Sequence, residues 1–269
     1  MKIQLLSDLH LECERPAIEP GKEFYHYNFP VAAEYLALLG DVGCTFQEEM
    51  FVWLRAQLPK FERIFFVTGN HEAYGFVEPY RSTITECHAR LHAFEVESNG
   101  RFVFLNQTRY DLSPTLTILG CTLWAALDPE YLDILSWALQ DFKRIEGFTP
   151  DAYVDAHRAD VAWLNDTVAR IAAEEPQRKI VVFSHHAPTI GGTSDPKFAG
   201  EVHPTNSAFA TELTGEVCWT TGNVVLWAYG HTHWCSDFIR DSVRVVSNQH
   251  GYREGGDGYD PAKIITVED

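Results

Sequence analysis

Eight short apolar segments, each four to six residues long, are spread along the chain and limit what it can fold into. This is the usual length of a buried β-strand and is too short for most core helices. The segments are residues 3–6, 35–39, 64–67, 102–105, 116–119, 180–183, 224–229 and 243–246. Longer stretches between some of them, residues 47–58, 79–94 and 153–175, carry apolar residues every three or four positions, which predicts amphipathic helices. Strands alternating with helices predict an α/β layered core.

No repeat, Gly/Ser linker or change of composition divides the chain, so we expect one domain over residues 1–269. The strands predicted after residue 224 are separated only by tight turns, which indicates antiparallel pairs. Residues 123–149 are rich in Trp, Leu and Asp and fit neither pattern well. Together with the helix that follows them, they are expected to form a helical cap around residues 123–175.

Five of the predicted strands are followed at once by polar residues that can bind a metal ion. These are Asp8 and His10, Asp41, Asn70 and His71, His185 and His186, and His231 and His233. Polar residues just beyond buried strands lie at the sheet edge where α/β proteins build their sites. Each motif alone is a weak signal, since an Asp in this position can cap a helix and a His pair can belong to the core. Six of the twelve histidines fall in these motifs, however, and this indicates one shared site.

Imidazole nitrogen, carboxylate oxygen and one amide oxygen suit borderline divalent cations. Two cations about 3.5–4 Å apart need a shared anionic ligand, and Asp41 is the natural candidate. These ligand types do not distinguish between Mn, Fe, Co, Ni and Zn. The sequence therefore predicts two divalent metal ions without identifying the element.

The motifs Asp-x-His, Gly-Asp, Gly-Asn-His-Glu, His-His-x-Pro and Gly-His-x-His follow one another over residues 8–233. This order resembles the signature of calcineurin-like metallophosphoesterases. The resemblance implies a four-layer fold in which two central mixed β-sheets are flanked by α-helices. It places one metal among Asp8, His10, Asp41 and His233, and the other among Asp41, Asn70, His231 and one histidine of the 185–186 pair. His185 is the first choice because it is nearer to the strand, and His186 is the alternative or otherwise faces the substrate.

The same resemblance implies hydrolysis of a small phosphomonoester or phosphodiester by a hydroxide that bridges the metals. Asp41 and His71 are then the catalytic residues: Asp41 bridges, and His71 protonates the leaving oxygen or contacts phosphate. Glu72 is expected to orient His71, as outer carboxylates do for imidazoles. Further candidates for the substrate pocket are His203, His250 and Tyr252.

Residues 7–12, Ser-Asp-Leu-His-Leu-Glu, resemble the start of a subgroup of small predicted phosphohydrolases. That subgroup tends to read Ser-Asn-Pro-Arg-Gly-Tyr near its C-terminus, whereas residues 247–252 read Ser-Asn-Gln-His-Gly-Tyr here. An arginine that could meet the substrate is therefore replaced by His250. This difference does not affect the predicted metal ligands, but it leaves the identity of the substrate open.

Charge and composition narrow the possible partners. The net charge of −17 and the lack of any Lys/Arg run argue against a nucleic-acid partner. The six cysteines form no Cys-x-x-Cys pair, and no signal peptide or apolar stretch of about 20 residues is found, so we expect a cytoplasmic protein without a membrane segment. The oligomeric state is open.

Two other functions compete with phosphate-ester hydrolysis. A non-catalytic scaffold on the same fold predicts eroded ligands, but none of the seven expected ligands is replaced. A two-metal hydrolase acting on a bond other than a phosphate ester stays open, because bound metals activate water equally well for another ester or amide.

Overall fold

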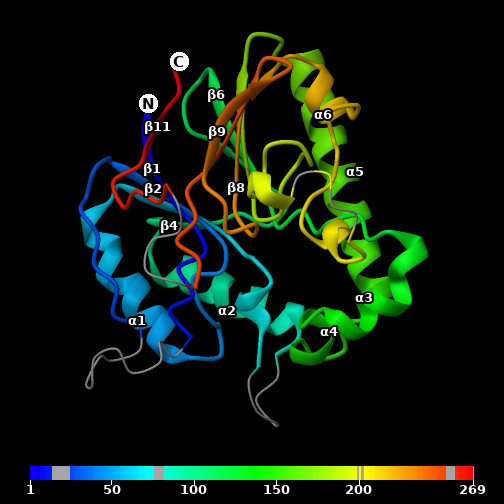
Figure 1. Cartoon of the computed structure of the whole chain (residues 1–269). Helices are drawn as coiled ribbons and strands as arrows, with labels where there is room; N and C mark the ends of the chain where they lie inside the picture. The colour runs from blue at the N-terminus through cyan, green and yellow to red at the C-terminus, as the bar shows by residue number, and fades with distance from the viewer. Residues whose placement is uncertain (14–24, 76–81, 199, 201–202, 253–257, 269) are drawn as a thin grey trace.

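In the computed structural model, the described residues are 1–13, 25–75, 82–198, 200, 203–252 and 258–268. Two mixed β-sheets lie against each other at the centre (Figure 1). The first has the order β11 (Ile264–Thr266), β1 (Lys2–Leu6), β2 (Tyr35–Leu39), β3 (Arg63–Val67) and β4 (Phe102–Phe104). The second has the order β5 (Thr108–Asp111), β6 (Leu116–Cys121), β7 (Lys179–Ser184), β8 (Val224–Tyr229), β10 (Val243–Ser247) and β9 (Ser236–Arg240). Only β11, β5 and β9 run antiparallel to their neighbours.

Helices cover the outer face of each sheet, so the expected fold class of two mixed sheets flanked by helices is confirmed. α1 (Glu48–Gln57) and α2 (Ile84–Glu97) pack on the first sheet, and α5 (Pro150–Glu174) with α6 (Val217–Thr220) on the second. The remaining helices are α3 (Leu132–Ala138), α4 (Asp141–Arg144) and the short 3₁₀ helices Leu58–Lys60, His71–Ala73, Pro129–Tyr131, Pro196–Phe198 and Asn206–Ala208.

The inner strands are mainly apolar, and β2 and β8 are apolar at every position, because both faces of such strands are buried. In β2, Leu36 and Leu38 belong to the cluster beneath α1 and α2. Ala37 and Leu39, which alternate with them, belong to the cluster between the two sheets. Continuous apolar runs were therefore the right signal for the eight strands that were predicted.

Three strands were missed, and all three are at sheet edges. β5 and β9 contain no fully buried residue, and β11 contains one, so none of them forms an apolar run. The tight turns after residue 224 do give one antiparallel pair, β9 with β10, but β8 pairs with β10 in parallel. The reason is that β9 occupies the edge position, outside β10 rather than between the two.

The helix predicted over 79–94 begins later, at Ile84. A capping box fixes this start: Thr83 Oγ1 accepts from the backbone N–H of Glu86, whose carboxylate accepts from the N–H of Thr83. Residues 79–81 lie outside the described residues.

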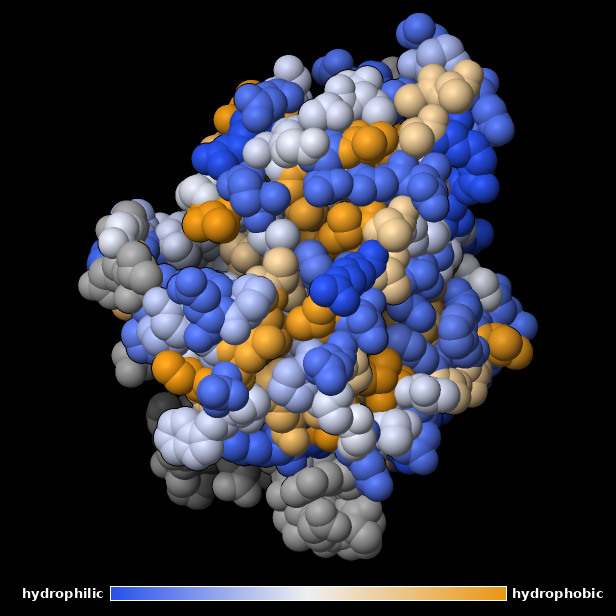
Figure 2. All heavy atoms as spheres, turned by 90° about the vertical axis from the view of Figure 1, so that its right-hand side faces the viewer, coloured by the Kyte–Doolittle hydropathy of each residue, from blue (hydrophilic) through white to orange (hydrophobic). Residues whose placement is uncertain are grey.

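The expected cap around residues 123–175 divides into two parts. α3 and α4 lie at one end of the sheets, beside the cavity described below. In α5, Leu164, Val168 and Ile171 instead pack on the second sheet as part of the outer helical layer. Figure 2 shows that the face formed by this side of the molecule is covered mainly by hydrophilic residues, with hydrophobic ones in separate small groups. In the described part of the chain, no helix has the length and apolarity that crossing a membrane requires.

Asp160 of α5 holds two loop residues in left-handed conformations. Its carboxylate accepts from Gln107 Nε2 at 2.9 Å and from the backbone N–H of Leu123 at 2.8 Å. Gln107 and Leu123 have φ angles of 48° and 53°. Burial raises the pKa of Asp160 to about 6 in spite of these hydrogen bonds.

This raised pKa predicts a pH-dependent stability. The native protein holds the Asp160 proton more tightly than the unfolded chain does, so the free energy of unfolding falls as pH rises from about 4 to about 6. In Asp160→Asn the group no longer titrates. We expect the stability of the wild type relative to this variant to fall by on the order of 2–3 kcal/mol across that window. Urea unfolding of both proteins at several pH values measures this difference, and a constant difference would contradict the assignment.

Candidate metal centre

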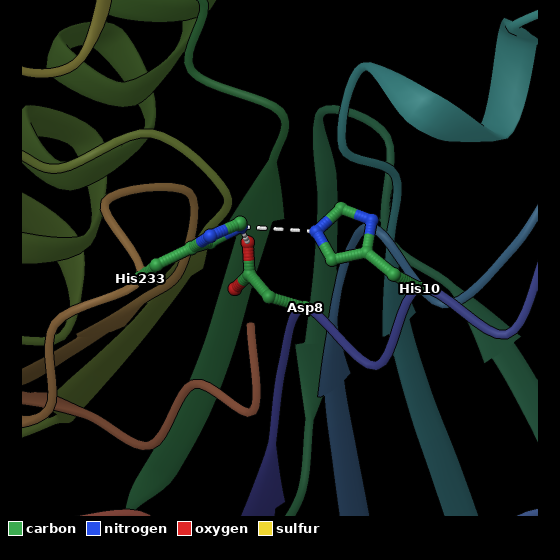
Figure 3. Close-up of side chains that lie close together, drawn as sticks. All are labelled: Asp8, His10 and His233. Atoms are coloured by element: carbon green, nitrogen blue, oxygen red, sulfur yellow. Dashed lines mark hydrogen bonds and ion pairs between the residues drawn. The ribbon is translucent and has the colours of Figure 1, made fainter. Parts of the chain in front are cut away.

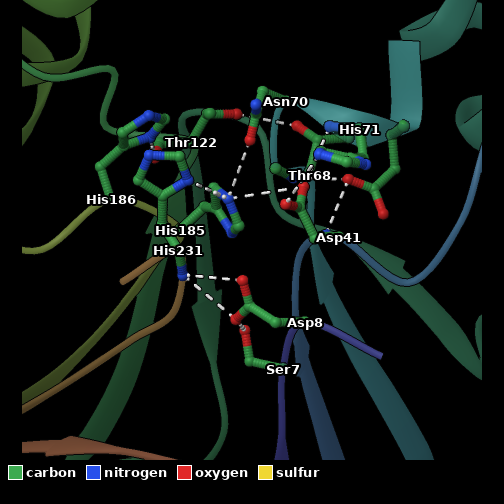
Figure 4. A network of polar contacts seen from close by, with 12 residues as sticks. Ser7, Asp8, Asp41, Thr68, Asn70, His71, Thr122, His185, His186 and His231 are labelled. Carbon is green, nitrogen blue, oxygen red and sulfur yellow. Dashed lines mark hydrogen bonds and ion pairs between the residues drawn. The ribbon is translucent and has the colours of Figure 1, made fainter. Parts of the chain in front are cut away.

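The predicted ligands meet where the carboxyl ends of strands from both sheets come together (Figure 4). Asp8, Asp41 and Asn70 follow β1, β2 and β3 of the first sheet. His185 and His231 follow β7 and β8 of the second. These strands are parallel to their neighbours within each sheet, so their ends converge on one edge. The site is thus built across the boundary between the sheets.

One cluster of ligand atoms contains Asp8, His10 and His233 (Figure 3), and these atoms all lie within 4.8 Å of one another. His10 Nε2 is 2.9 Å from His233 Nε2, which is 3.4 Å from Asp8 Oδ1. Asp41 Oδ2 approaches the same place, 3.8 Å from His10 Nε2.

A second cluster contains Asp41, His185 and His231. His185 Nε2 lies 3.1 Å from His231 Nδ1 and 3.3 Å from Asn70 Oδ1. It is also 3.5 Å from Asp41 Oδ1. The two oxygens of Asp41 therefore face different clusters, Oδ2 toward His10 and Oδ1 toward His185.

This donor set fits divalent cations. Ring nitrogens and carboxylate oxygens converge from several elements, and lone pairs that face one another at about 3 Å repel unless a proton or a cation lies between them. Burial and the neighbouring His185 lower the pKa of His231 to about 3, so this imidazole is neutral, as a metal ligand must be. Burial alone would raise the pKa of the Asp8 carboxyl group. The nearby His233, His185 and His10 lower it by more, so the pKa lies below its usual value and Asp8 is ionised.

Five of the candidate ligand residues have left-handed backbones. Their φ angles run from 46° to 72°, and they are Asp8, His10, Asp41, His231 and His233. A non-glycine residue in this region is strained by roughly 1–2 kcal/mol, and such residues gather at functional sites. Backbone hydrogen bonds hold the turns, for example from the N–H of Asp8 to Gly40 O and from the N–H of His10 to Asp41 O.

The glycine of the Gly-Asn-His-Glu motif is required by close packing. A Cβ atom at Gly69 would lie 2.2 Å from Asp41 Oδ1 and 2.6 Å from His185 Cε1. Any side chain here would push apart the two residues that the motif brings together.

His71 lies next to the first cluster and is held by Glu12. His71 Nδ1 donates to Glu12 Oε1 at 2.7 Å, and His10 Nδ1 is 3.2 Å from the same oxygen. Burial lowers the pKa of His71, but Asp41 and Glu12 raise it to a net value of about 9. His71 Nε2 faces Tyr252 Oη, 3.2 Å away, and Asp41 Oδ2, 3.8 Å away.

The carboxylate that we expected to orient His71 was Glu72, and the structure places Glu12 there instead. Glu72 accepts from the backbone N–H groups of Asp41, Val42 and Gly69 at 2.7–3.0 Å. It therefore fixes the two turns that carry ligands. Glu12 was missed as a partner of His71, although it closes the Ser-Asp-Leu-His-Leu-Glu motif; its spacing from His10 was the available signal.

The two histidines of the 185–186 pair have different surroundings. His185 belongs to the second cluster, as described above. The ring of His186 lies 3.3 Å from Tyr153 Oη and 3.4 Å from Thr122 O, through different nitrogens, and it lines the cavity. The geometry thus favours His185 as the ligand and puts His186 in the position expected for contact with substrate.

Of the other residues predicted to lie in the substrate pocket, one lines the cavity and two do not. Tyr252 lines the cavity and stacks on His10 with ring centroids 4.2 Å apart. His250 is buried between the rings of Tyr27 and Tyr259, and exposed His203 lies close to Thr205 Oγ1; neither lines the cavity. The histidine at the position of the absent arginine therefore does not replace its contact.

Gln249, the other departure in the 247–252 stretch, supports the Gly-His-x-His turn. Its Oε1 accepts from the backbone N–H of His233. Its Nε2 donates to Thr232 Oγ1 and Trp234 O, both at 3.0 Å. The altered residue thus strengthens the turn that presents His233.

A cavity of about 510 Å³ opens over the clusters. Its floor includes Asp41, Asn70, His71, His231 and His233, and its walls include Tyr74, Leu139, Arg144, Phe209 and Tyr252. This size admits a small molecule and not a folded partner.

Comparison with known proteins is consistent with this geometry. A family model described as calcineurin-like phosphoesterase matches residues 1–235. An uncharacterized protein of Acanthamoeba polyphaga mimivirus is 26% identical over 278 residues, covering 99% of this chain and 96% of that protein. The solved structure of phosphopantetheinyl hydrolase from Mycobacterium tuberculosis matches with a TM-score of 0.66 and 19% identity, over 93% of this chain and 89% of that one. At this identity the likeness shows a shared fold.

Proposed function

The chain belongs to the calcineurin-like phosphoesterase family, and we propose that it hydrolyses a small phosphate ester at a centre of two divalent cations. Such cations, when bound, make water a good nucleophile near neutral pH and stabilise charge on phosphoryl oxygens. Asp8, His10 and His233 are proposed to hold one cation, and Asn70, His185 and His231 the other. Asp41 is proposed to be shared by both.

The observation that carries this proposal is the position of Asp41. Each of its oxygens faces a separate histidine cluster, at 3.8 Å from His10 Nε2 and 3.5 Å from His185 Nε2. A carboxylate in this position suits a bridge between two cations. The backbone N–H of His71 donates to Asp41 Oδ1 at 2.9 Å, which fixes the orientation of the carboxylate.

His71 is the proposed general acid. It carries its proton on Nε2, at the cavity, while Nδ1 is occupied by Glu12. Tyr252 Oη, 3.2 Å from Nε2, marks the place where an ester oxygen would receive the proton. The negative charges of Asp41 and Glu12 raise the pKa of His71, which favours the protonated form that can donate.

Glu12→Gln is expected to lower kcat by about 10–100-fold, the usual effect of removing a carboxylate that orients an imidazole. Glu12 Oε1 serves both His10 and His71, and its other oxygen has no hydrogen-bond partner among the described residues. A glutamine can still offer one oxygen to both rings, but it removes the negative charge that raises the pKa of His71. Turnover and metal content of the variant measure the effect, and an unchanged kcat would remove Glu12 from the mechanism.

The proposed function is tested by the metal content of the purified protein, measured together with hydrolysis of p-nitrophenyl phosphate and bis-p-nitrophenyl phosphate. About two metal ions per chain with turnover supports the proposal, and the preferred ester distinguishes a monoesterase from a diesterase. Inhibition by vanadate or inorganic phosphate is expected for phosphoryl chemistry only. Turnover of carboxylic esters without such inhibition would favour the hydrolase acting on another bond. Absence of bound metal after reconstitution with Mn would overturn the proposal.

A further inference from the structure

Arg144 brings a guanidinium group to the lining of the cavity. Among the described residues of the lining, Arg144 is the single Lys or Arg. It ends α4, and its guanidinium carbon lies over the ring of Tyr74, 5.8 Å from the ring centroid. Its Nε donates to Gln140 Oε1 at 3.4 Å. These contacts hold a partly buried guanidinium at the cavity wall, in a chain whose net charge is −17.

Tyr74 lies between Arg144 and the ring of His71. The rings of Tyr74 and His71 lie 4.3 Å apart between centroids, and Tyr74 Oη accepts from Asn70 Nδ2 at 2.7 Å. His71, Tyr74 and Arg144 thus form a row that leads from the metal ligands to the cavity wall. If His71 protonates the leaving oxygen, the row lies along the leaving group.

The proposed cations and Arg144 are suited to different parts of a substrate. The two cations proposed above would meet the phosphate that is cleaved, so that phosphate does not need Arg144. A guanidinium beside a cavity suits carboxylate and phosphate oxygens, to which it donates through a planar fork. The lining also includes the apolar residues Ala138, Leu139 and Phe209, together with Gln140 and the buried Asp141.

We propose that Arg144 binds a second oxyanion, a carboxylate or a phosphate, on the leaving group of the substrate. This rests on the proposed function. The preferred substrates are then small phosphate esters whose leaving group has an apolar body and an anionic end. Arg144 is a specificity residue in this proposal.

The test compares three phenyl phosphates that carry a carboxylate, a phosphonate or a neutral carboxamide at the meta position. The wild type is expected to prefer at least one of the two anionic esters over the carboxamide by about 10–100-fold in kcat/KM, the usual effect of a charged hydrogen bond. The stronger of the two identifies the oxyanion. Arg144→Gln should remove this preference and change turnover of the carboxamide by less than about threefold. Arg144→Lys should keep part of the preference.

Lys143→Gln is the matched control, because Lys143 is the neighbouring cation, lies over Trp137 and does not line the cavity. It should keep the full preference. A wild type that treats all three esters alike overturns the inference and leaves the proposed function intact. So does an Arg144→Gln variant that loses activity equally on all three, because a purely structural role predicts that result.

If no ester is turned over, the proposed function fails, and binding decides the inference separately. Calorimetry with the non-hydrolysable phosphonates of the same three compounds gives the affinities directly. Tighter binding of an anionic compound that disappears in Arg144→Gln supports the inference, and equal affinities overturn it.

Discussion

Replacing Asp41 by Ala is expected to abolish turnover and to lower the amount of metal that the protein binds. The variant loses a carboxylate whose two oxygens face the two histidine clusters. Bound metals contribute several kcal/mol to the stabilisation of charge in the transition state, and each 1.4 kcal/mol or so is a factor of about ten in rate. The expected loss is therefore at least about 10³-fold. Metal analysis and steady-state kinetics measure the two effects together.

Two further variants separate the charge of Asp41 from its contacts. Asp41→Asn keeps an oxygen that accepts from the N–H of His71, so it preserves the turn and should still lose activity and metal. Asp160→Asn also removes a buried carboxylate, but one that lies in the outer layer, and it should keep both. Wild-type activity in either Asp41 variant would overturn the assignment of a shared carboxylate.

His71→Ala is expected to keep its metals and to lower the rate by about 10²–10⁴-fold, the usual contribution of a general acid. His71 Nε2 is 3.8 Å from Asp41 Oδ2 and lines the cavity, and its other nitrogen is occupied by Glu12. The loss should be largest for alkyl esters, whose leaving oxygens need a proton. It should be smallest for p-nitrophenyl esters, whose anion leaves readily.

The dependence on the leaving group is what distinguishes a proton donor from a residue that only shapes the cavity. Equal losses on alkyl and p-nitrophenyl esters would favour the second role, and loss of metal would make His71 a ligand. His203→Ala is a suitable control, because His203 is exposed, does not line the cavity and should be replaceable without effect.

The sequence predicted those strands whose own residues form an apolar run. β2 and β8 were found with their observed ends, because each is apolar throughout. β5, β9 and β11 were missed because a strand at an edge can be partly polar, and its pairing depends on a neighbour rather than on its own composition. The pairing of β8 with β10 depends in the same way on where β9 lies.

In the candidate site, too, local motifs could be predicted and contacts between distant segments could not. The ligand motifs could be recognised because each one follows a buried strand, and the fold brings the ends of those strands together. Contacts between segments far apart in sequence gave no such signal: Glu12 with His71, and Arg144 with Tyr74. Glu72 was assigned to its sequence neighbour His71, but its carboxylate holds backbone N–H groups instead.

The left-handed backbone of the candidate ligands predicts a pattern of substitutions among relatives. The five positions are Asp8, His10, Asp41, His231 and His233. Each of these positions has a side chain where glycine would be less strained, and under the proposed function selection for metal binding opposes the change to glycine. In a descendant that no longer needs the metals, that opposition disappears. Glycine, rather than alanine, should then accumulate at these five positions, so that an inactive relative could be recognised from its sequence by where its glycines appear.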